Sequence, residues 1–135
     1  MEDSVKTPAQ DKVYIRYIVH DVKESVDFYT QFLGFNVKMQ PPGNGFAMLE
    51  SGNLYLLLNT PGQGGAGQSL SDGSVPTPGG WNRIQIRVDD LDQKISELEA
   101  MKAPFRNEII KGNGGAQILL ADPSGNLIEL FESYR

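Results

Sequence analysis

The chain has 135 residues, 39% of them hydrophobic and 21% charged, which suits one globular domain with its own core. Its formal net charge of −5 disfavours nucleic acid or an anionic membrane as the main partner, because both attract clustered Lys and Arg. The absence of cysteine excludes disulfides, thiolate nucleophiles and cysteine-ligated zinc.

No apolar run approaches the roughly 18–20 residues that span a bilayer. The N-terminal sequence MEDSVKTPAQ is polar and lacks the apolar stretch of a secretory signal. We therefore expect a cytoplasmic protein in which residues 1–11 form an N-terminal tail.

Residues 12–59 contain the first of two similar units. Alternating apolar residues before Asp21 predict a strand, and apolar residues at helical spacing after it predict an amphipathic helix. Asp21 is placed to cap the start of that helix, and Gly34 to end it. One more strand is expected over residues 35–41, followed by a strand-turn-strand segment in GFAMLESGNLYLLLN (45–59).

Residues 60–80, TPGQGGAGQSLSDGSVPTPGG, are rich in Gly, Ser and Pro. Such a segment buries little surface and is expected to be a mobile loop. Two interpretations stay open: it is a plain linker, or it closes over a site at the strand that follows.

Residues 81–135 repeat the first unit at a constant offset. Val88 matches Val19, and Asp90 matches Asp21 as a helix cap. One more strand is expected over residues 105–111, and GAQILLADPSGNLIELFE (115–132) matches the strand-turn-strand segment of the first unit. Each unit is therefore predicted to be βαβββ. A single helix covers only one face of a four-stranded sheet, so the chain is expected to be an α+β protein whose uncovered faces are shared or curled into a cleft.

The segments VHDVKESVDFYTQFLGF (19–35), RVDDLDQKISELEA (87–100) and DPSGNLIELFE (122–132) resemble the vicinal oxygen chelate superfamily. This group includes glyoxalase I, bleomycin-resistance proteins, fosfomycin-resistance enzymes and extradiol dioxygenases. The resemblance covers residues 12–135 and implies a single domain, with module one at 12–59, a linker at 60–80 and module two at 81–135. It also implies a U-shaped cleft between paired βαβββ modules, and a homodimer.

Metal-dependent members of this superfamily carry His, Gln or Glu at four cleft positions. The resemblance places Tyr14 and Leu56 of module one, and Arg83 and Glu129 of module two, at these positions. Only Glu129 keeps a ligand type, because Leu56 has no donor atom and Arg83 would repel a cation. Tyr14 would ligate only as a phenolate. Forming a phenolate is unfavourable at neutral pH, because an ordinary tyrosine has a pKa of about 10. We therefore predict no metal ligand and no cofactor.

Strand alternation predicts which side chains line the cleft. Arg83 and Glu129 are expected to form an ion pair that either shapes a site or serves the fold alone. Trp81 is expected either to stack on a ligand or to fill a hydrophobic gap. The predicted ligand-binding residues are Tyr14, Arg16, Leu56, Trp81, Arg83, Gln85, Arg87, Glu129 and Phe131.

The expected function is binding of a small neutral or anionic, partly aromatic metabolite or drug, since apolar walls with a few placed donors are typical of small-molecule pockets. One alternative is a metal-independent lyase or isomerase, in which Glu129 is the base, Arg83 stabilises an oxyanion and Tyr14 donates a proton. Another is a metal-dependent lyase or dioxygenase with non-standard ligands, for which the nearby donors are Glu50, Asn59, Asn82 and Glu132. These alternatives leave open whether the protein is an enzyme.

Overall fold

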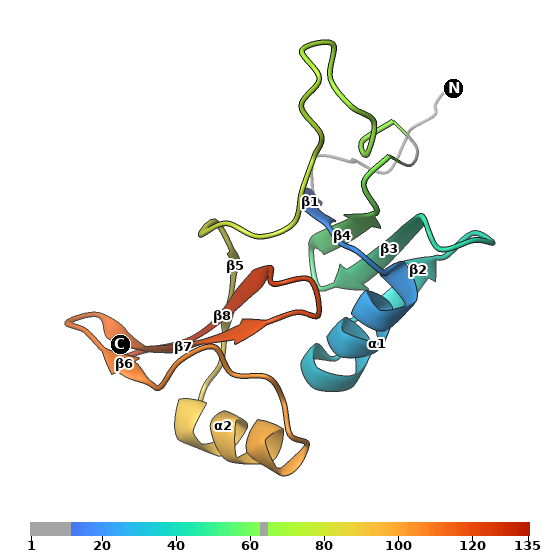
Figure 1. Cartoon of the computed structure of the whole chain (residues 1–135). Coiled ribbons are helices and arrows are strands. Elements are labelled where there is room, and N and C mark those ends of the chain that lie inside the picture. The colour runs from blue at the N-terminus through green and yellow to red at the C-terminus, as the bar shows by residue number, and fades with distance from the viewer. Residues whose placement is uncertain (1–11, 63–64) are drawn as a thin grey trace, which may run out of the picture.

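The computed structural model describes residues 12–62 and 65–135, so the predicted N-terminal tail lies outside the described residues. Two helices and eight strands follow the predicted order (Figure 1). The elements are β1 (Val13–Ile18), α1 (Val22–Leu33), β2 (Asn36–Met39), β3 (Phe46–Ser51), β4 (Leu54–Asn59), β5 (Ile84–Arg87), α2 (Leu91–Ala100), β6 (Ile110–Lys111), β7 (Gly115–Ala121) and β8 (Leu127–Ser133). Within the described residues, neither helix is long and apolar enough to cross a membrane.

The strands form two four-stranded sheets of matching topology, which confirms the predicted βαβββ repeat. Sheet one has the order β1-β4-β3-β2 and sheet two has the order β5-β8-β7-β6. In each sheet the first and last strands of the module pair in parallel, and the remaining pairs are antiparallel. The described part of segment 60–80 contains no helix or strand.

Both helices begin at the predicted aspartates. The Asp21 carboxylate accepts a hydrogen bond from the Glu24 backbone amide at 3.0 Å, and Asp90 accepts one from Gln93 at the same distance. These bonds satisfy amides that the first helical turn leaves free. Gly34 ends α1 in the left-handed conformation, with φ of 71°, which a glycine adopts without strain.

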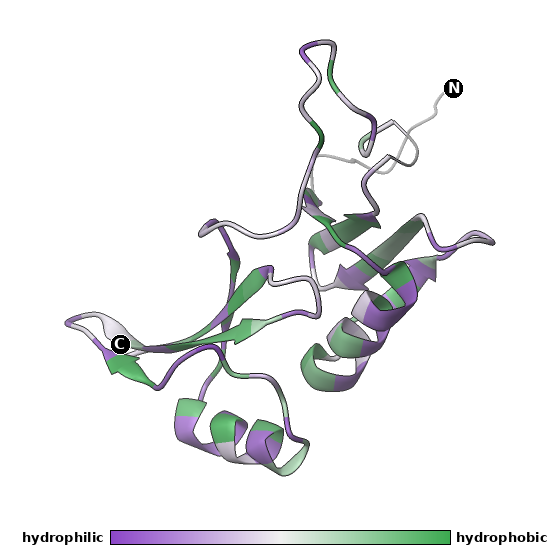
Figure 2. Ribbon diagram, in the orientation of Figure 1, coloured by the Kyte–Doolittle hydropathy of each residue, from purple (hydrophilic) through white to green (hydrophobic). Residues whose placement is uncertain are grey.

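The register determines which side chains each helix covers. In sheet one, Ile15 pairs with Leu56 and Tyr17 with Leu58, so these residues share one face. Leu56 and Leu58 are fully buried in the core with apolar residues of α1. Figure 2 shows hydrophobic residues concentrated along the strands, whereas both helices alternate hydrophobic and hydrophilic residues. We call the other face of each sheet its helix-free face.

The prediction that Leu56 lines the ligand cleft is therefore wrong. The observed register of β4 differs by one residue from the predicted alternation, and a one-residue slip moves every side chain of a strand to the opposite face. Tyr55, Leu57 and Asn59 are the β4 residues on the helix-free face, because they pair in register with Tyr14, Arg16 and Ile18.

The strand expected over residues 105–111 is also shorter than predicted. Only β6, at its end, pairs with β7, while Phe105 makes an isolated bridge to Leu120. The side chain of Asn107 accepts a hydrogen bond from the Leu119 amide at 2.9 Å, and the Arg106 amide donates to the Leu119 carbonyl at 2.8 Å. A side chain thus replaces a backbone partner, which interrupts the regular strand ladder.

Buried polar groups join the two modules. The Tyr17 hydroxyl donates to the Leu127 carbonyl at 2.8 Å and accepts from the Ile84 amide at 3.0 Å. The Tyr29 hydroxyl donates to Asp122 at 2.8 Å, and Asn126 donates to the carbonyl of Ile18 at 2.8 Å.

The Asp122 carboxylate also accepts from the backbone amides of Ser124 and Asn126, and from the Asn126 side chain. Burial, together with the nearby Asp122 charge, raises the pKa of Tyr29 well above its usual value, so Tyr29 is a neutral donor. Several donors therefore stabilise the carboxylate of Asp122, a residue that is only 4% exposed.

We expect Tyr29→Phe to lower the free energy of unfolding by about 2 kcal/mol, because it removes one hydrogen bond to a buried charged group. Denaturant unfolding measures this change. Tyr134→Phe is the matched control, since Tyr134 is 52% exposed and its variant is expected to stay within about 0.5 kcal/mol of the parent. Equal stability of Tyr29→Phe and Tyr134→Phe would contradict the proposed role of the bond.

Candidate functional site

A row of polar side chains crosses the helix-free face of sheet two. β5 pairs in parallel with β8, which sets Gln85 beside Glu129 and Arg87 beside Phe131. Arg83 precedes β5 on the same side of the alternation. The structure therefore brings together five of the predicted ligand-binding residues: Arg83, Gln85, Arg87, Glu129 and Phe131.

Glu129 is the buried centre of this row. Its Oε1 atom accepts a hydrogen bond from Arg83 Nε at 3.0 Å and lies 3.0 Å from Arg83 Nη2. Its Oε2 atom accepts from Gln85 Nε2 at 2.6 Å. The Glu129 side chain is 8% exposed and that of Arg83 is 26% exposed. The predicted Arg83–Glu129 ion pair is thus present, and both carboxylate oxygens have a protein donor.

The row continues from Gln85 to Arg87. Gln85 Oε1 accepts from Arg87 Nε at 2.7 Å, so the Gln85 amide donates to Glu129 at one end and accepts from Arg87 at the other. The Arg87 guanidinium also lies over the Phe131 ring, with its central carbon 4.9 Å from the ring centroid. These two contacts fix Arg87 while it remains exposed. Sheet two therefore presents a positioned cation beside an aromatic ring.

Trp81 lies at the entrance to β5, where its backbone carbonyl accepts from Arg83 Nη1 at 3.2 Å. Its side chain is 68% exposed, so the prediction that it fills a hydrophobic gap is wrong. Trp81 borders a hollow of about 240 Å³ that is also lined by Gly80, Arg106, Gly125 and Leu127. Sequence reasoning missed Arg106, because it lies in the irregular segment before β6.

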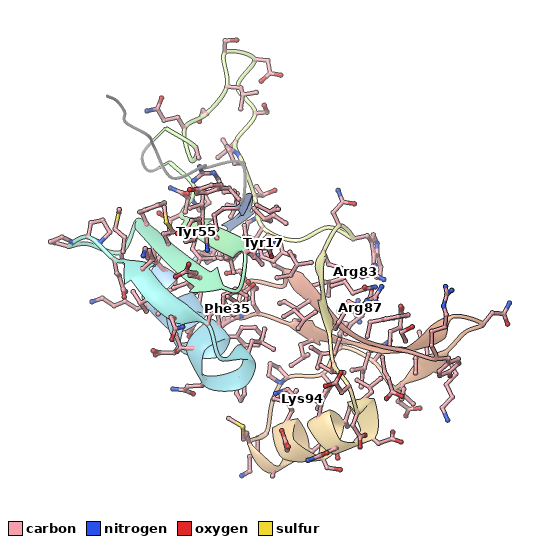
Figure 3. All side chains as sticks on the ribbon, turned by 180° about the vertical axis from the view of Figure 1, so that it is seen from behind. Tyr17, Phe35, Tyr55, Arg83, Arg87 and Lys94 are labelled. Atoms are coloured by element: carbon pink, nitrogen blue, oxygen red, sulfur yellow. The ribbon has the colours of Figure 1, made fainter. Side chains whose placement is uncertain are left out.

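The predicted site residues of module one make their contacts within sheet one. The rings of Tyr14 and Tyr55 are 4.9 Å apart, and Arg16 donates through Nη1 to Asn59 Oδ1. Among the contacts of the described residues, none joins Tyr14 to Arg83 or Glu129. Tyr55 lies on sheet one. Figure 3 shows Arg83 and Arg87 extending from β5 on the side that faces away from sheet one.

The register also corrects the comparison between the two modules. Gln85 pairs with Glu129 in sheet two, and Arg16, its counterpart in the repeat, pairs with Leu57 in sheet one. Leu57, not Leu56, is therefore the equivalent of Glu129, and it is equally without a donor atom. Asn59 and Glu50 belong to the helix-free face of sheet one, since Asn59 pairs with Ile18 and Glu50 pairs with Tyr55. Among residues 12–62 and 65–135, no three His, Asp or Glu side chains are grouped to hold a metal ion.

Solved structures share this fold. A lactoylglutathione lyase from Agrobacterium tumefaciens is 20% identical with a TM-score of 0.69, over 88% of this chain and 90% of that one. TnmS3, an antibiotic binding protein from Streptomyces sp. CB03234, is 20% identical with a TM-score of 0.68, over 98% and 99% of the two chains. A superfamily member from Sphaerobacter thermophilus is 23% identical with a TM-score of 0.68, over 90% and 96%. A search of the curated proteins gave no significant match.

The family comparison agrees with the fold and with the repeated βαβββ topology. Residues 13–130 match the model of the Glyoxalase/Bleomycin resistance protein/Dioxygenase superfamily, which spans both modules and every strand of the two sheets except the end of β8. The chain therefore belongs to this superfamily.

Proposed function

We propose that this protein binds a small organic molecule without a metal ion, and that the ligand is neutral or anionic and partly aromatic. The observation that supports the proposal most strongly is the state of Glu129, whose two carboxylate oxygens both accept hydrogen bonds from Arg83 or Gln85. A carboxylate engaged in this way by a guanidinium is a poor ligand for a second cation.

The other three positions support the same conclusion. A divalent metal needs about three protein ligands drawn from His, carboxylate or similar donors. Leu57 has no donor, Arg83 carries a permanent positive charge, and the Tyr14 ring lies against the Tyr55 ring in a tilted arrangement. This donor set does not fit a divalent ion.

The chemistry of the ligand follows from the exposed end of the row. Arg87 uses Nε for Gln85, which leaves its Nη atoms for an acceptor on a ligand. The Phe131 ring beneath it and the exposed Trp81 nearby in sequence offer surfaces for an aromatic group. A structural neighbour described as an antibiotic binding protein shows that this fold can serve binding.

Catalysis with Glu129 as base has less support. A general base must direct a free lone pair at the proton that it removes. Glu129 is buried, and its oxygens face Arg83 and Gln85. The likeness to a lactoylglutathione lyase is a likeness of fold, since only 20% of residues are identical.

We also propose that two copies of the chain associate. The Arg83 and Arg87 side chains point away from sheet one of their own chain, so a second copy is needed to place a sheet one face opposite them (Figure 3). A symmetric dimer would form two such sites. Sedimentation equilibrium at micromolar concentration is expected to give the mass of a dimer, and a monomer at every concentration would contradict the association.

Arg87→Leu is expected to weaken binding of naphthoate, used as an aromatic carboxylate probe, roughly 10-fold, because it removes a charge-assisted hydrogen bond. The change leaves the Arg83–Glu129 pair in place. Amide NMR titration measures the affinity and locates the probe through the signals of β5 and β8. Arg135→Leu, the same change at the exposed C-terminus, is the control and should bind as the parent does. Unchanged affinity of Arg87→Leu, or tighter binding of naphthylmethylamine than of naphthoate, would contradict the proposal.

A further inference from the structure

A hollow of about 280 Å³ lies between α2 and sheet two. Its two walls are α2 and the chain segment 105–109, and Ile118 of β7 lies at its base. Ile118 pairs with Leu130, whereas its neighbour Leu119 pairs with Glu129 of the polar row. Alternation therefore places Ile118 on the face of the sheet that α2 covers, opposite the row. We call this space the α2 hollow.

The α2 hollow has apolar walls because α2 covers its sheet less fully than α1 does. α1 buries five of its residues, whereas α2 buries only Leu91 and Leu98. Ile95 of α2, together with Phe105 and Ile109 of the opposite wall, is only partly buried. Apolar surface thus stays accessible in the hollow, and a ligand that removes it from water gains free energy.

Hydrogen bonds fix both walls of the hollow. Glu132 Oε1 accepts from the Leu91 amide at 2.7 Å, which holds the start of α2 against β8. The Ala121 amide donates to the Pro104 carbonyl at 3.1 Å, and the Asn107 side chain joins the opposite wall to β7. The hollow is therefore formed before a ligand arrives, which lowers the entropic cost of binding.

The two walls run in opposite directions. The chain turns back after α2 and runs toward β6 (Figure 1). Phe105 bridges to Leu120 near the end of β7. Ala116, near the beginning of β7, pairs with Glu132, which holds the start of α2. Phe105 therefore lies toward the C-terminal end of α2, and Glu108 lies toward its N-terminal end.

The charged residues that line the hollow, among the residues described, are all acidic. Asp92 and Glu99 lie on the same face of α2 as Ile95, because spacings of three and four residues form one helical stripe. Their positions are about 10 Å apart along the helix axis. Glu108, on the opposite wall, lies toward the Asp92 end. Carboxylates thus stand at both ends of an apolar floor.

Glu99 has an unfavourable position in its own helix. The free carbonyl groups at a helix C-terminus carry partial negative charge, so basic side chains are favoured in the last turn. The last turn of α2 contains no basic residue, and Glu99 adds a carboxylate near this end. A cation bound beside Glu99 is therefore attracted by the carboxylate and by the helix terminus together.

We propose that the α2 hollow binds a linear aliphatic diamine or polyamine. One ammonium group lies between Asp92 and Glu108, a second lies beside Glu99, and the methylene chain between them covers Ile95 and Ile109. A single exposed carboxylate attracts an ammonium group only weakly in water, so affinity depends on using both ends and on burying the spacer. The volume is near the lower end of the range for small-molecule sites, which suits a narrow molecule.

This proposal does not depend on the function proposed for the helix-free face. None of the residues that line the α2 hollow belongs to the polar row of sheet two. The two sites also take ligands of opposite charge, because the row presents the Arg87 guanidinium and the hollow presents carboxylates.

α,ω-Diaminooctane can reach both ends of the hollow and is the probe, and octylamine, which lacks one charge, is the matched comparison. Titration at low ionic strength, followed by amide NMR, should shift the signals of residues 92–99, 105–109 and Ile118. We expect diaminooctane to bind about 5-fold more tightly than octylamine, because it forms one more ion pair. Diaminobutane is too short to span the hollow and should lose this advantage.

Two substitutions remove the charge at either end of the hollow. Glu99→Gln and Glu108→Gln should each weaken diaminooctane binding about 3-fold, and should affect octylamine less, because a single ammonium group can use the remaining end. Glu97→Gln is the matched control. It makes the same change of net charge on the same helix, but Glu97 lies 4.0 Å from Lys94 and does not line the hollow. Its affinity for diaminooctane should equal that of the parent.

Three outcomes would overturn the proposal. Equal loss of affinity in Glu97→Gln and Glu99→Gln would show attraction to the net charge alone. Equal affinities for diaminooctane and octylamine would show that the two ends do not act together. Shifts confined to β5 would place the probe on the other face of sheet two, where Gln85 and Arg87 lie. Because α2 and β5 have their own signals, failure here is distinguishable from failure of the site on the helix-free face.

Discussion

The contact between Arg83 and Glu129 organises the polar side chains on the helix-free face of sheet two. Burying a carboxylate is unfavourable unless a charge and hydrogen bonds compensate it, and Arg83 and Gln85 supply both. Since Gln85 donates to Glu129, its oxygen is left to orient Arg87, which then lies over Phe131. One buried pair thus determines the orientation of the whole row.

The two modules have the same topology but present different chemistry. Sheet one carries the Tyr14–Tyr55 ring contact and the Arg16–Asn59 contact, whereas sheet two carries the ion pair and the Arg87–Phe131 contact. The strand positions are equivalent, so the difference lies in the side chains alone. The buried polar contacts between modules serve the fold, and they leave the helix-free faces free to diverge.

The repeat and the helix boundaries were predictable from the sequence because they depend on local periodicity and capping, whereas the placing of Arg83 and Glu129 together came from the family resemblance. In β4, the run LYLLL is apolar at every position, so periodicity could not decide which residues face the helix, and Leu56 was assigned to the wrong face. The pairings of Tyr17 and Tyr29 with module two join residues far apart in sequence, and no local pattern indicates them.

We propose that the Arg83 guanidinium and the aliphatic side chain of Leu57 stand where a divalent ion would otherwise bind. Elemental analysis of protein purified without added metal, followed by calorimetric titration with zinc and iron(II), tests it most directly. We expect no stoichiometric metal after purification and no binding at micromolar concentrations of either ion. One tightly held zinc or iron per chain would contradict the account.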